Sequence, residues 1–269
     1  MKINRAWKIY FSPTGTTKKV LDLITSGLSE NIQEHDFTLP ENRQYFPEVL
    51  AGDLVFFGVP TYAGRVPNVL LKYLDTICGN GALAVPVVTF GNRSFDNSLI
   101  ELRDILENHG FHTLAAAALS CEHSFSYVLG AGRPDSSDEA ECIAFGDNVR
   151  RKVMELPYLP PAIHVPGISE NYGGYYKPQD RKGIHIDIRK VAPKVSEACT
   201  DCGLCAKICP MGSIVPGNIR EMQGICIKCG ACYKRCPVSA RYFDDPGYLY
   251  HKEELETVYQ RRAENQFFI

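Results

Sequence analysis

Two runs of four cysteines with the same spacing constrain this chain more than any other feature. The first run reads Cys199-x-x-Cys202-x-x-Cys205-x-x-x-Cys209-Pro210, and the second reads Cys226-x-x-Cys229-x-x-Cys232-x-x-x-Cys236-Pro237. A structural zinc site needs a single four-ligand set, and a disulfide scaffold needs an oxidising compartment. Two identical four-cysteine runs fit neither alternative, so we interpret them as ligands of iron–sulfur clusters.

The gaps within each run predict which thiolates act together. Three cysteines separated by two residues can reach three irons of one cubane, whereas the fourth points away and ligates the other cluster. We therefore expect two interlocked 4Fe-4S clusters. One is bound by Cys199, Cys202, Cys205 and Cys236, and the other by Cys209, Cys226, Cys229 and Cys232. Ligation by cysteine alone, without histidine, predicts low reduction potentials and hence a role in electron transfer.

Residues 1–156 alternate short apolar runs with amphipathic segments, which is typical of an open α/β sheet. Apolar runs at 7–11, 54–59, 83–90 and 114–119 predict buried parallel strands, and a weaker strand is expected near 35–39. Helical patterns follow at about 16–29, 67–78, 95–109 and 136–155. The fold class is therefore α/β, with a doubly wound five-stranded parallel sheet whose strand order the sequence leaves open.

Beyond residue 156 the pattern changes. Prolines and glycines throughout 157–193 exclude a long helix and predict a linker, with one short strand at 184–188. Its tyrosines indicate that it packs on another part of the chain. The cysteine-rich residues 194–245 are expected to form a small α+β domain, and residues 246–269 a helical tail with a polar helix from about 252 to 264.

The charge distribution gives no reason to expect nucleic acid or a membrane as a partner. The formal net charge is −2; residues 1–150 hold 12 Lys and Arg against 18 Asp and Glu, and residues 151–269 hold 17 against 13. The positive second half can be compensated by the negative clusters. No apolar run approaches the roughly 20 residues that span a bilayer, and the N-terminus has too short an apolar stretch for a signal peptide. We expect a cytoplasmic protein, and the sequence does not fix its oligomeric state.

Three polar loops follow predicted strands, at the sheet edge where open α/β folds bind ligands. The loop Ser12-Pro13-Thr14-Gly15-Thr16-Thr17 opens a helix, so its N–H groups and hydroxyls form an anion site, although such a loop can also be only a helix cap. The other two loops carry aromatic, glycine and amide groups that suit a flat polar heterocycle. They are Pro60-Thr61-Tyr62-Ala63-Gly64-Arg65 and Phe90-Gly91-Asn92-Arg93-Ser94-Phe95.

These motifs carry a resemblance to a known family. Ser12-x-Thr14-Gly15-x-Thr17 resembles the phosphate signature of flavodoxins, and its combination with the two cysteine runs resembles the flavodoxin–ferredoxin fusion proteins of anaerobic microbes. Three further segments are similar to that family: Gly91-Asn92-Arg93, Glu122-His123-Ser124 and Gly132-Arg133-Pro134-Asp135. The resemblance covers nearly the whole chain and implies a flavodoxin-like domain at 1–156, a linker at 157–193 and a ferredoxin domain at 194–245.

The resemblance also implies that the first domain binds flavin mononucleotide (FMN), unless it has lost its cofactor. The phosphate would be held by Ser12, Thr14, Gly15, Thr16 and Thr17. The ring would lie between two loops that comprise Pro60, Thr61, Tyr62, Ala63, Gly64, Phe90, Gly91, Asn92 and Arg93. Two departures stand out: Pro13 has no N–H to donate, and Arg65 would bring a cation near the ring and raise its reduction potential.

Some residues have both a functional and a structural interpretation. His123, next to Glu122, could donate a proton to a reduced flavin or to a substrate, and could equally serve as a structural hydrogen-bond partner. Three cysteines lie outside the runs, and we expect them to be core residues, although the second could be close to a flavin. They are Cys78, Cys121 and Cys142.

The motifs predict an electron carrier that works between redox proteins, its donor and acceptor. The alternative is an FMN-dependent oxidoreductase that acts on a small molecule, and a weaker alternative is a regulatory role. No G-x-G-x-x-G follows a strand, so a separate nicotinamide-binding domain is not expected. A pocket over the ring lined by His123, Arg65 and Arg93 would favour an enzyme, whereas a flavin edge open to solvent would favour a carrier.

Overall fold

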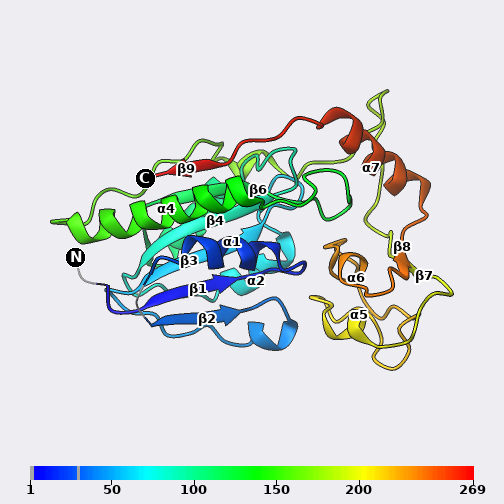
Figure 1. The fold of residues 1–269 in the computed structure, drawn as a ribbon, viewed down its shortest axis with the longest axis horizontal. Helices are drawn as coiled ribbons and strands as arrows, with labels where there is room; N and C mark the ends of the chain where they lie inside the picture. Colours follow the sequence, from blue (N-terminus) through cyan, green and yellow to red (C-terminus); the bar gives the residue numbers. More distant parts are fainter. Residues whose placement is uncertain (1–2, 29–30) are drawn as a thin grey trace.

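The five expected strands form one parallel sheet in the computed structural model, which describes residues 3–28 and 31–269. The strands are β1 (Ala6–Tyr10), β2 (Ile32–Asp36), β3 (Leu54–Pro60), β4 (Leu83–Phe90) and β6 (Ala116–Ser120). Their spatial order is β2-β1-β3-β4-β6 (Figure 1). Counted along the chain, this is the 2-1-3-4-5 order of the flavodoxin-like doubly wound fold. The predicted fold class is therefore confirmed.

Helices cover both faces of the sheet. The helices α1 (Thr16–Ile24) and α4 (Ser136–Glu155) pack on one apolar layer, whereas α2 (Leu71–Leu74) and α3 (Ser98–Asn108) pack on the other. Alternation along β3 supplies both layers, since Phe56 lies in the first and Phe57 in the second. The end of the helix predicted at 16–29 lies outside the described residues. The short helix α2 and the adjoining turn η2 (Asn68–Leu70) replace the longer helix predicted at 67–78.

Close packing of α1 against α4 depends on one glycine. A Cβ on Gly146 in α4 would lie 1.8 Å from the carbonyl oxygen of Ile24, so no larger residue fits there without separating the helices. The buried thiols of Cys121 and Cys142 belong to the same apolar layer, as expected, and burial raises the pKa of the Cys142 thiol to about 12. The expectation of a core position is wrong for Cys78, which is exposed.

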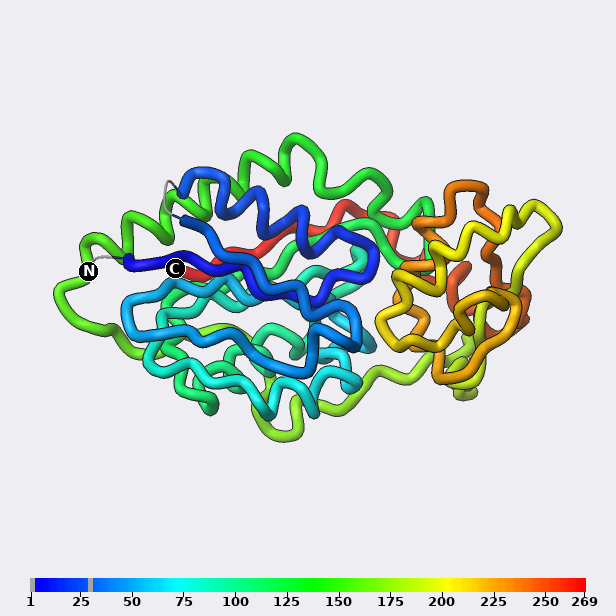
Figure 2. Tube along the Cα trace, turned by 90° about the horizontal axis from the view of Figure 1, so that it is seen from below, coloured from blue at the N-terminus to red at the C-terminus, as the bar shows by residue number. Residues whose placement is uncertain are grey.

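Residues 194–245, which we call the cysteine-rich half, lie beyond the carboxyl ends of the strands (Figures 1 and 2). It contains two one-turn helices, α5 (Leu204–Lys207) and α6 (Ala231–Lys234), and a two-stranded antiparallel sheet of β7 (Lys194–Val195) and β8 (Arg241–Tyr242). Each helix follows a cysteine loop and begins at a glycine with a left-handed backbone, Gly203 with φ 73° and Gly230 with φ 80°. The internal sequence repeat is thus also a structural repeat.

The linker and the tail differ from their predictions. The strand expected at 184–188 does not form, and a single bridge joins Gln179 to His185 instead. The last helix, α7 (Pro246–Val258), starts and ends earlier than predicted because Asp245 caps it and Pro246 occupies its first turn. After α7 the chain returns to the first half and forms β9 (Gln266–Phe268), which pairs antiparallel with β6. Two short elements complete the remaining segments: η1 (Pro40–Arg43) and η3 (Asn171–Gly173).

The sheet contains one more short strand, β5 (His112–Thr113), which pairs with β4. Among the described residues, no helix combines the length and the apolar character that crossing a bilayer requires.

Candidate redox site between the two halves

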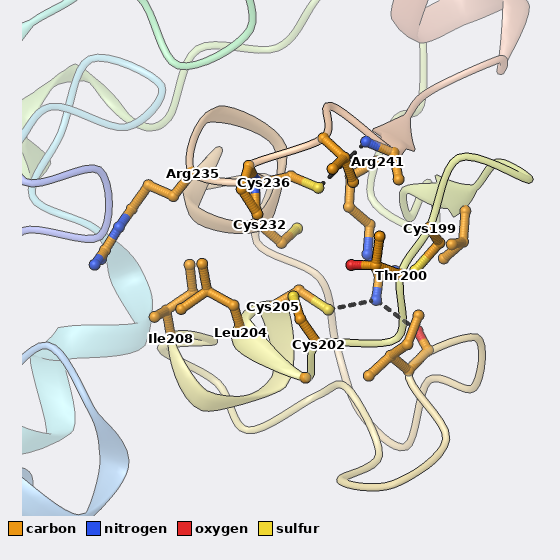
Figure 3. Close-up of a pocket in the computed structure, with 16 residues that line it drawn as sticks. Cys199, Thr200, Cys202, Leu204, Cys205, Ile208, Cys232, Arg235, Cys236 and Arg241 are labelled. Atoms are coloured by element: carbon orange, nitrogen blue, oxygen red, sulfur yellow. Dashed lines mark hydrogen bonds between the residues drawn. The ribbon is translucent and has the colours of Figure 1, made fainter.

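The eight cysteines of the two runs surround two cavities in the groups that the spacing predicted. One cavity is lined by Cys199, Cys202, Cys205 and Cys236 (Figure 3), and the other by Cys209, Cys226, Cys229 and Cys232. Cys232 borders both cavities, so the two sites adjoin. The fourth cysteine of each run has crossed to the cavity of the other run. This exchange is the interlocking that the spacing of two-cluster ferredoxins requires.

Backbone N–H groups and one guanidinium donate to the thiols. The N–H groups of Ser213 and Ala240 lie 3.3 and 3.2 Å from the sulfurs of Cys209 and Cys236, at equivalent positions of the repeat. The buried Arg241 donates from Nη2 to Cys205 Sγ at 3.0 Å. Donors of this kind favour the thiolate form and tune the potential of a bound cluster.

The thiols around the two cavities suit iron–sulfur clusters. Within residues 3–28 and 31–269, no three His, Cys, Asp or Glu side chains are grouped as ligands of one metal ion. The thiols instead surround cavities. In a cubane each thiolate binds a different iron, so the thiols do not converge on one point. The donor set, thiolate with amide donors, is the one that iron–sulfur clusters use.

The N-terminal loop borders an open cavity of about 430 Å³ at the start of α1. Thr14, Gly15 and Thr16 line this cavity. Gly15 has a left-handed backbone with φ 88°, and nothing lies within 4 Å of a Cβ placed on it. The first N–H groups of α1 have no partner inside the helix, so they can bind an anion placed in the cavity. We call this space the phosphate cavity.

Two of the residues predicted to bind the phosphate shape the loop instead of lining the cavity. The Ser12 hydroxyl accepts from the N–H of Lys18 at 3.0 Å, and its own N–H donates to Thr38 Oγ1 at 2.7 Å. The hydroxyls of Thr17 and Thr89 lie 2.9 Å apart in the interior. These bonds fix the loop in the conformation that presents Thr14 to Thr16.

A larger cavity, of about 1020 Å³, lies between the two ring loops and the cysteine-rich half. The ring loops contribute Thr61, Tyr62, Ala63, Gly64, Gly91, Arg93 and Ser94, and the second cysteine run contributes Cys226, Ile227 and Lys228. We call this space the ring cavity. Ser124 lines both it and the phosphate cavity, so the two are neighbours. Burial, together with the nearby thiols of Cys229 and Cys226, raises the pKa of the Tyr62 phenol well above its usual range.

The structure does not bring every predicted ring residue into this cavity. Pro60 ends β3, and Phe90 is buried against Phe95 in the core. The amide of Asn92 holds the tail: it donates to the carbonyls of Tyr259 and Arg261 at 2.8 and 2.6 Å. Its Oδ1 accepts from the N–H of Ala263 at 3.0 Å. Asn92 therefore anchors the returning chain that ends in β9.

Arg65 does not place a free cation beside the ring. Its guanidinium forms two 2.6 Å hydrogen bonds with the carboxylate of Glu101, which is buried. The rings of Tyr172 and Tyr175 from the linker cover it at 4.8 and 4.7 Å from their centroids. The expected effect of Arg65 on flavin potential therefore lacks its basis, since the charge is neutralised and turned toward the linker.

His123 lines the ring cavity and is neutral at physiological pH. Burial, reinforced by the nearby His251, Lys234 and Arg93, lowers its pKa to about 3. Its Nδ1 accepts from the N–H of Phe125 at 3.0 Å, so the neutral ring carries its proton on Nε2. A Cβ on Gly91 would lie 2.2 Å from His123 Cδ2, which explains the glycine. His123 can thus donate a hydrogen bond from Nε2, but it does not act as an imidazolium acid near pH 7.

Several lining residues were not predicted. Phe125 and His251 complete one wall of the ring cavity, and Tyr175 and Tyr176 of the linker complete another. Arg93 lies over Tyr176 with its guanidinium carbon 4.7 Å from the ring centroid. The cluster of tyrosines in a proline-rich segment was the available signal. Nothing in the sequence indicated which loops they would cover.

Contacts between the halves surround the two cavities. Lys234 of α6 pairs with Glu122 at 2.6 Å and lies 3.9 Å from the centroid of the Tyr127 ring. A Cβ on Gly230 would lie 2.8 Å from the carbonyl oxygen of Ser124. The cysteine-rich half is therefore packed directly against the loops that follow β6.

Three comparisons with known proteins gave the following results. Residues 198–241 match the model of the 4Fe-4S dicluster domain family. A search of curated proteins finds no match. Among solved structures, an archaeal flavodoxin is similar at 16% identity and a TM-score of 0.41, covering 56% of this chain and 99% of its own. An FMN-bound flavodoxin of Fusobacterium nucleatum is similar at 14% identity and a TM-score of 0.38, covering 56% and 98%.

A third similar structure is the rubredoxin:oxygen oxidoreductase of Desulfovibrio gigas, at 13% identity and a TM-score of 0.41, covering 57% of this chain and 37% of its own. At such scores the assignment of the fold depends on the strand order of this chain itself. That order defines a flavodoxin-like α/β domain, and the matched segment is of the 4Fe-4S dicluster type. The chain joins the two, as the resemblance to flavodoxin–ferredoxin fusions implied.

Proposed function

We propose that this chain is an iron–sulfur flavoprotein that transfers single low-potential electrons between two 4Fe-4S clusters and FMN, as a carrier between redox proteins. The ring cavity is the observation that carries the proposal. It is lined on one side by the loops after β3 and β4 and on the other by Cys226, Ile227 and Lys228. A flavin bound there would share a wall with a cluster ligand, and this proximity is what electron transfer requires.

The residues around the two cavities fit FMN. Thr14, Gly15 and Thr16 would hold the phosphate, and Tyr62, Gly64 and Gly91 would flank the ring. FMN can hold one or two electrons, whereas each cluster passes one. Tyr62 is protonated near pH 7, as an ordinary phenol is, and burial raises its pKa further. It can therefore donate a hydrogen bond. Tyr176 and Phe125 add aromatic walls to the cavity.

The two clusters would have different roles. The one bound by Cys209, Cys226, Cys229 and Cys232 borders the ring cavity and would exchange electrons with the flavin. The other would face an external partner, since its ligand Cys202 is exposed whereas Cys229 is buried. Electrons would therefore pass from partner to outer cluster, then to inner cluster and flavin, or in the reverse direction.

Anaerobic purification followed by metal, sulfide and flavin analysis tests the proposal. We expect about eight irons per chain and one FMN after loading. Stepwise reduction should bleach cluster absorption and flavin absorption in separate phases. Colourless protein with zinc at the thiols would refute the clusters, and flavin that stays substoichiometric after loading would refute the role of the first half.

A second candidate is an oxidoreductase that passes electrons to a small molecule. The ring cavity favours it, because about 1020 Å³ lies at the upper end of the roughly 300–1,000 Å³ of typical small-molecule sites. His123 and Arg93 line the cavity, as this alternative requires, but Arg65 does not. The two functions separate in kinetics. A carrier oxidises its flavin at a rate that depends on the partner protein, whereas an enzyme turns over with a small oxidant alone.

A further inference from the structure

The phosphate cavity has one wall from each half of the chain. The flavodoxin-like half contributes Thr14 to Thr16 and Lys19, and the cysteine-rich half contributes Lys234 and Arg235. In Figure 3, Arg235 extends away from the cysteine cavity and toward the N-terminal part of the chain. Its Nη1 lies 3.4 Å from the carbonyl oxygen of Pro13, within the phosphate loop itself.

Among the described residues, Arg235 is the basic group of this cavity whose charge is not paired with a carboxylate. Lys19 pairs with Glu139 at 3.0 Å, Arg133 with Asp138 at 2.6 Å, and Lys234 with Glu122 at 2.6 Å. Within the described parts of the chain, no carboxylate lies within ion-pair distance of Arg235. Its side chain is exposed at the edge of the open cavity.

The internal repeat shows that the ferredoxin-like fold does not itself need a cation at this position. Arg235 precedes the last cysteine of the second run, and Ile208 precedes the last cysteine of the first. Both residues border the cysteine cavity shown in Figure 3, but only Arg235 of the two also lines the phosphate cavity. Arg235 reaches the loop in which Pro13 lacks an N–H, so its guanidinium supplies donors where the backbone has lost one.

We propose that Arg235 is a ligand of the flavin phosphate, so that the flavin is held by both halves and its phosphate stabilises their packing. The inference rests on the proposed function, because it requires FMN in the neighbouring cavities. A guanidinium binds phosphate oxygens through paired N–H groups, which gives a charge-assisted contact. Riboflavin, which lacks the phosphate, gains nothing from this residue.

The test compares FMN with riboflavin on the flavin-free chain with its clusters intact, by quenching of flavin fluorescence under anaerobic conditions. Arg235→Ile installs the residue that the first run tolerates at the equivalent position. We expect it to weaken FMN binding about tenfold or more and to leave riboflavin binding unchanged. Arg235→Lys should retain part of the affinity for FMN. Lys207→Ala, which removes an exposed cation from α5, is the matched control and should leave both affinities unchanged.

Two outcomes overturn the inference in different ways. If Arg235→Ile keeps its iron content and its preference for FMN over riboflavin equals that of the unmodified chain, Arg235 does not bind the phosphate, while the proposed function stands. If the unmodified chain binds neither flavin, the flavin site itself fails and the inference fails with it. If Arg235→Ile loses iron, Arg235→Gln is measured in its place. It is judged by the same ratio of the affinity for FMN to the affinity for riboflavin.

Discussion

The two halves of this chain are stabilised by different interactions. The α/β half buries two apolar layers, one on each face of a sheet in which Phe56 and Phe57 are fully buried. Between residues 194 and 245, the buried apolar side chains are few and mostly small: Ile214, Ile219, Cys229, Ala231 and Ala240. A core of this size cannot offset the chain entropy of about fifty residues. The first half therefore folds by hydrophobic burial, and the second depends on the metal bound by its thiols.

Removing the metal should produce the largest effect and the sharpest contrast between the halves. We expect complete chelation of iron to unfold residues 194–245, because binding of metal supplies the free energy of folding there. The strands β1, β3 and β4 should keep their protection from amide hydrogen exchange. Hydrogen exchange measured along the chain, together with visible absorption, checks both expectations. Cys78→Ser, outside both runs, is the control and should keep full iron content; protection of α5 and α6 that survived iron removal would contradict the comparison.

Breaking one buried ion pair should destabilise the α/β half by a smaller amount. Arg65→Met leaves the carboxylate of Glu101, with 2% of its side chain exposed, without its partner. Removing one member of such a pair costs about 3–5 kcal/mol of unfolding free energy. Urea unfolding followed by the signal of Trp7 measures it. Arg189→Met breaks a pair that is open to solvent and should leave the midpoint unchanged; an equal effect of both substitutions would show that burial is not the cause.

Arg65 also shows where inference from the sequence ends. The strands, the doubly wound fold and the grouping of the eight cysteines follow from short-range patterns, namely apolar runs and fixed gaps. Arg65 and Asn92 lie in correctly predicted loops, but their partners are 36 and about 170 residues away. A residue type and a loop position do not reveal whether a side chain faces a ligand or a distant segment. The strand β9 was missed for the same reason, since the linker and the cysteine-rich half separate it in the sequence from its partner β6.

The boundary between the halves should respond to pH, with the smallest of the three effects. His123 lies there with a pKa near 3 in the folded chain, and an unfolded chain restores the ordinary value of about 6.5. Between these values the unfolded state binds the proton and the folded state does not, so stability is complete above about pH 6.5 and falls as the pH is lowered toward 3. Burial of the neighbouring His251, which lowers its pKa to about 4, acts in the same direction.

His123→Gln should flatten part of this dependence of stability on pH. Urea unfolding midpoints measured between pH 6.5 and 5 check it, and visible absorption verifies that the clusters stay intact over this range. Because both histidines line the ring cavity, we expect their protonation to act at the boundary between the halves. An unchanged slope in His123→Gln would place the acid sensitivity elsewhere.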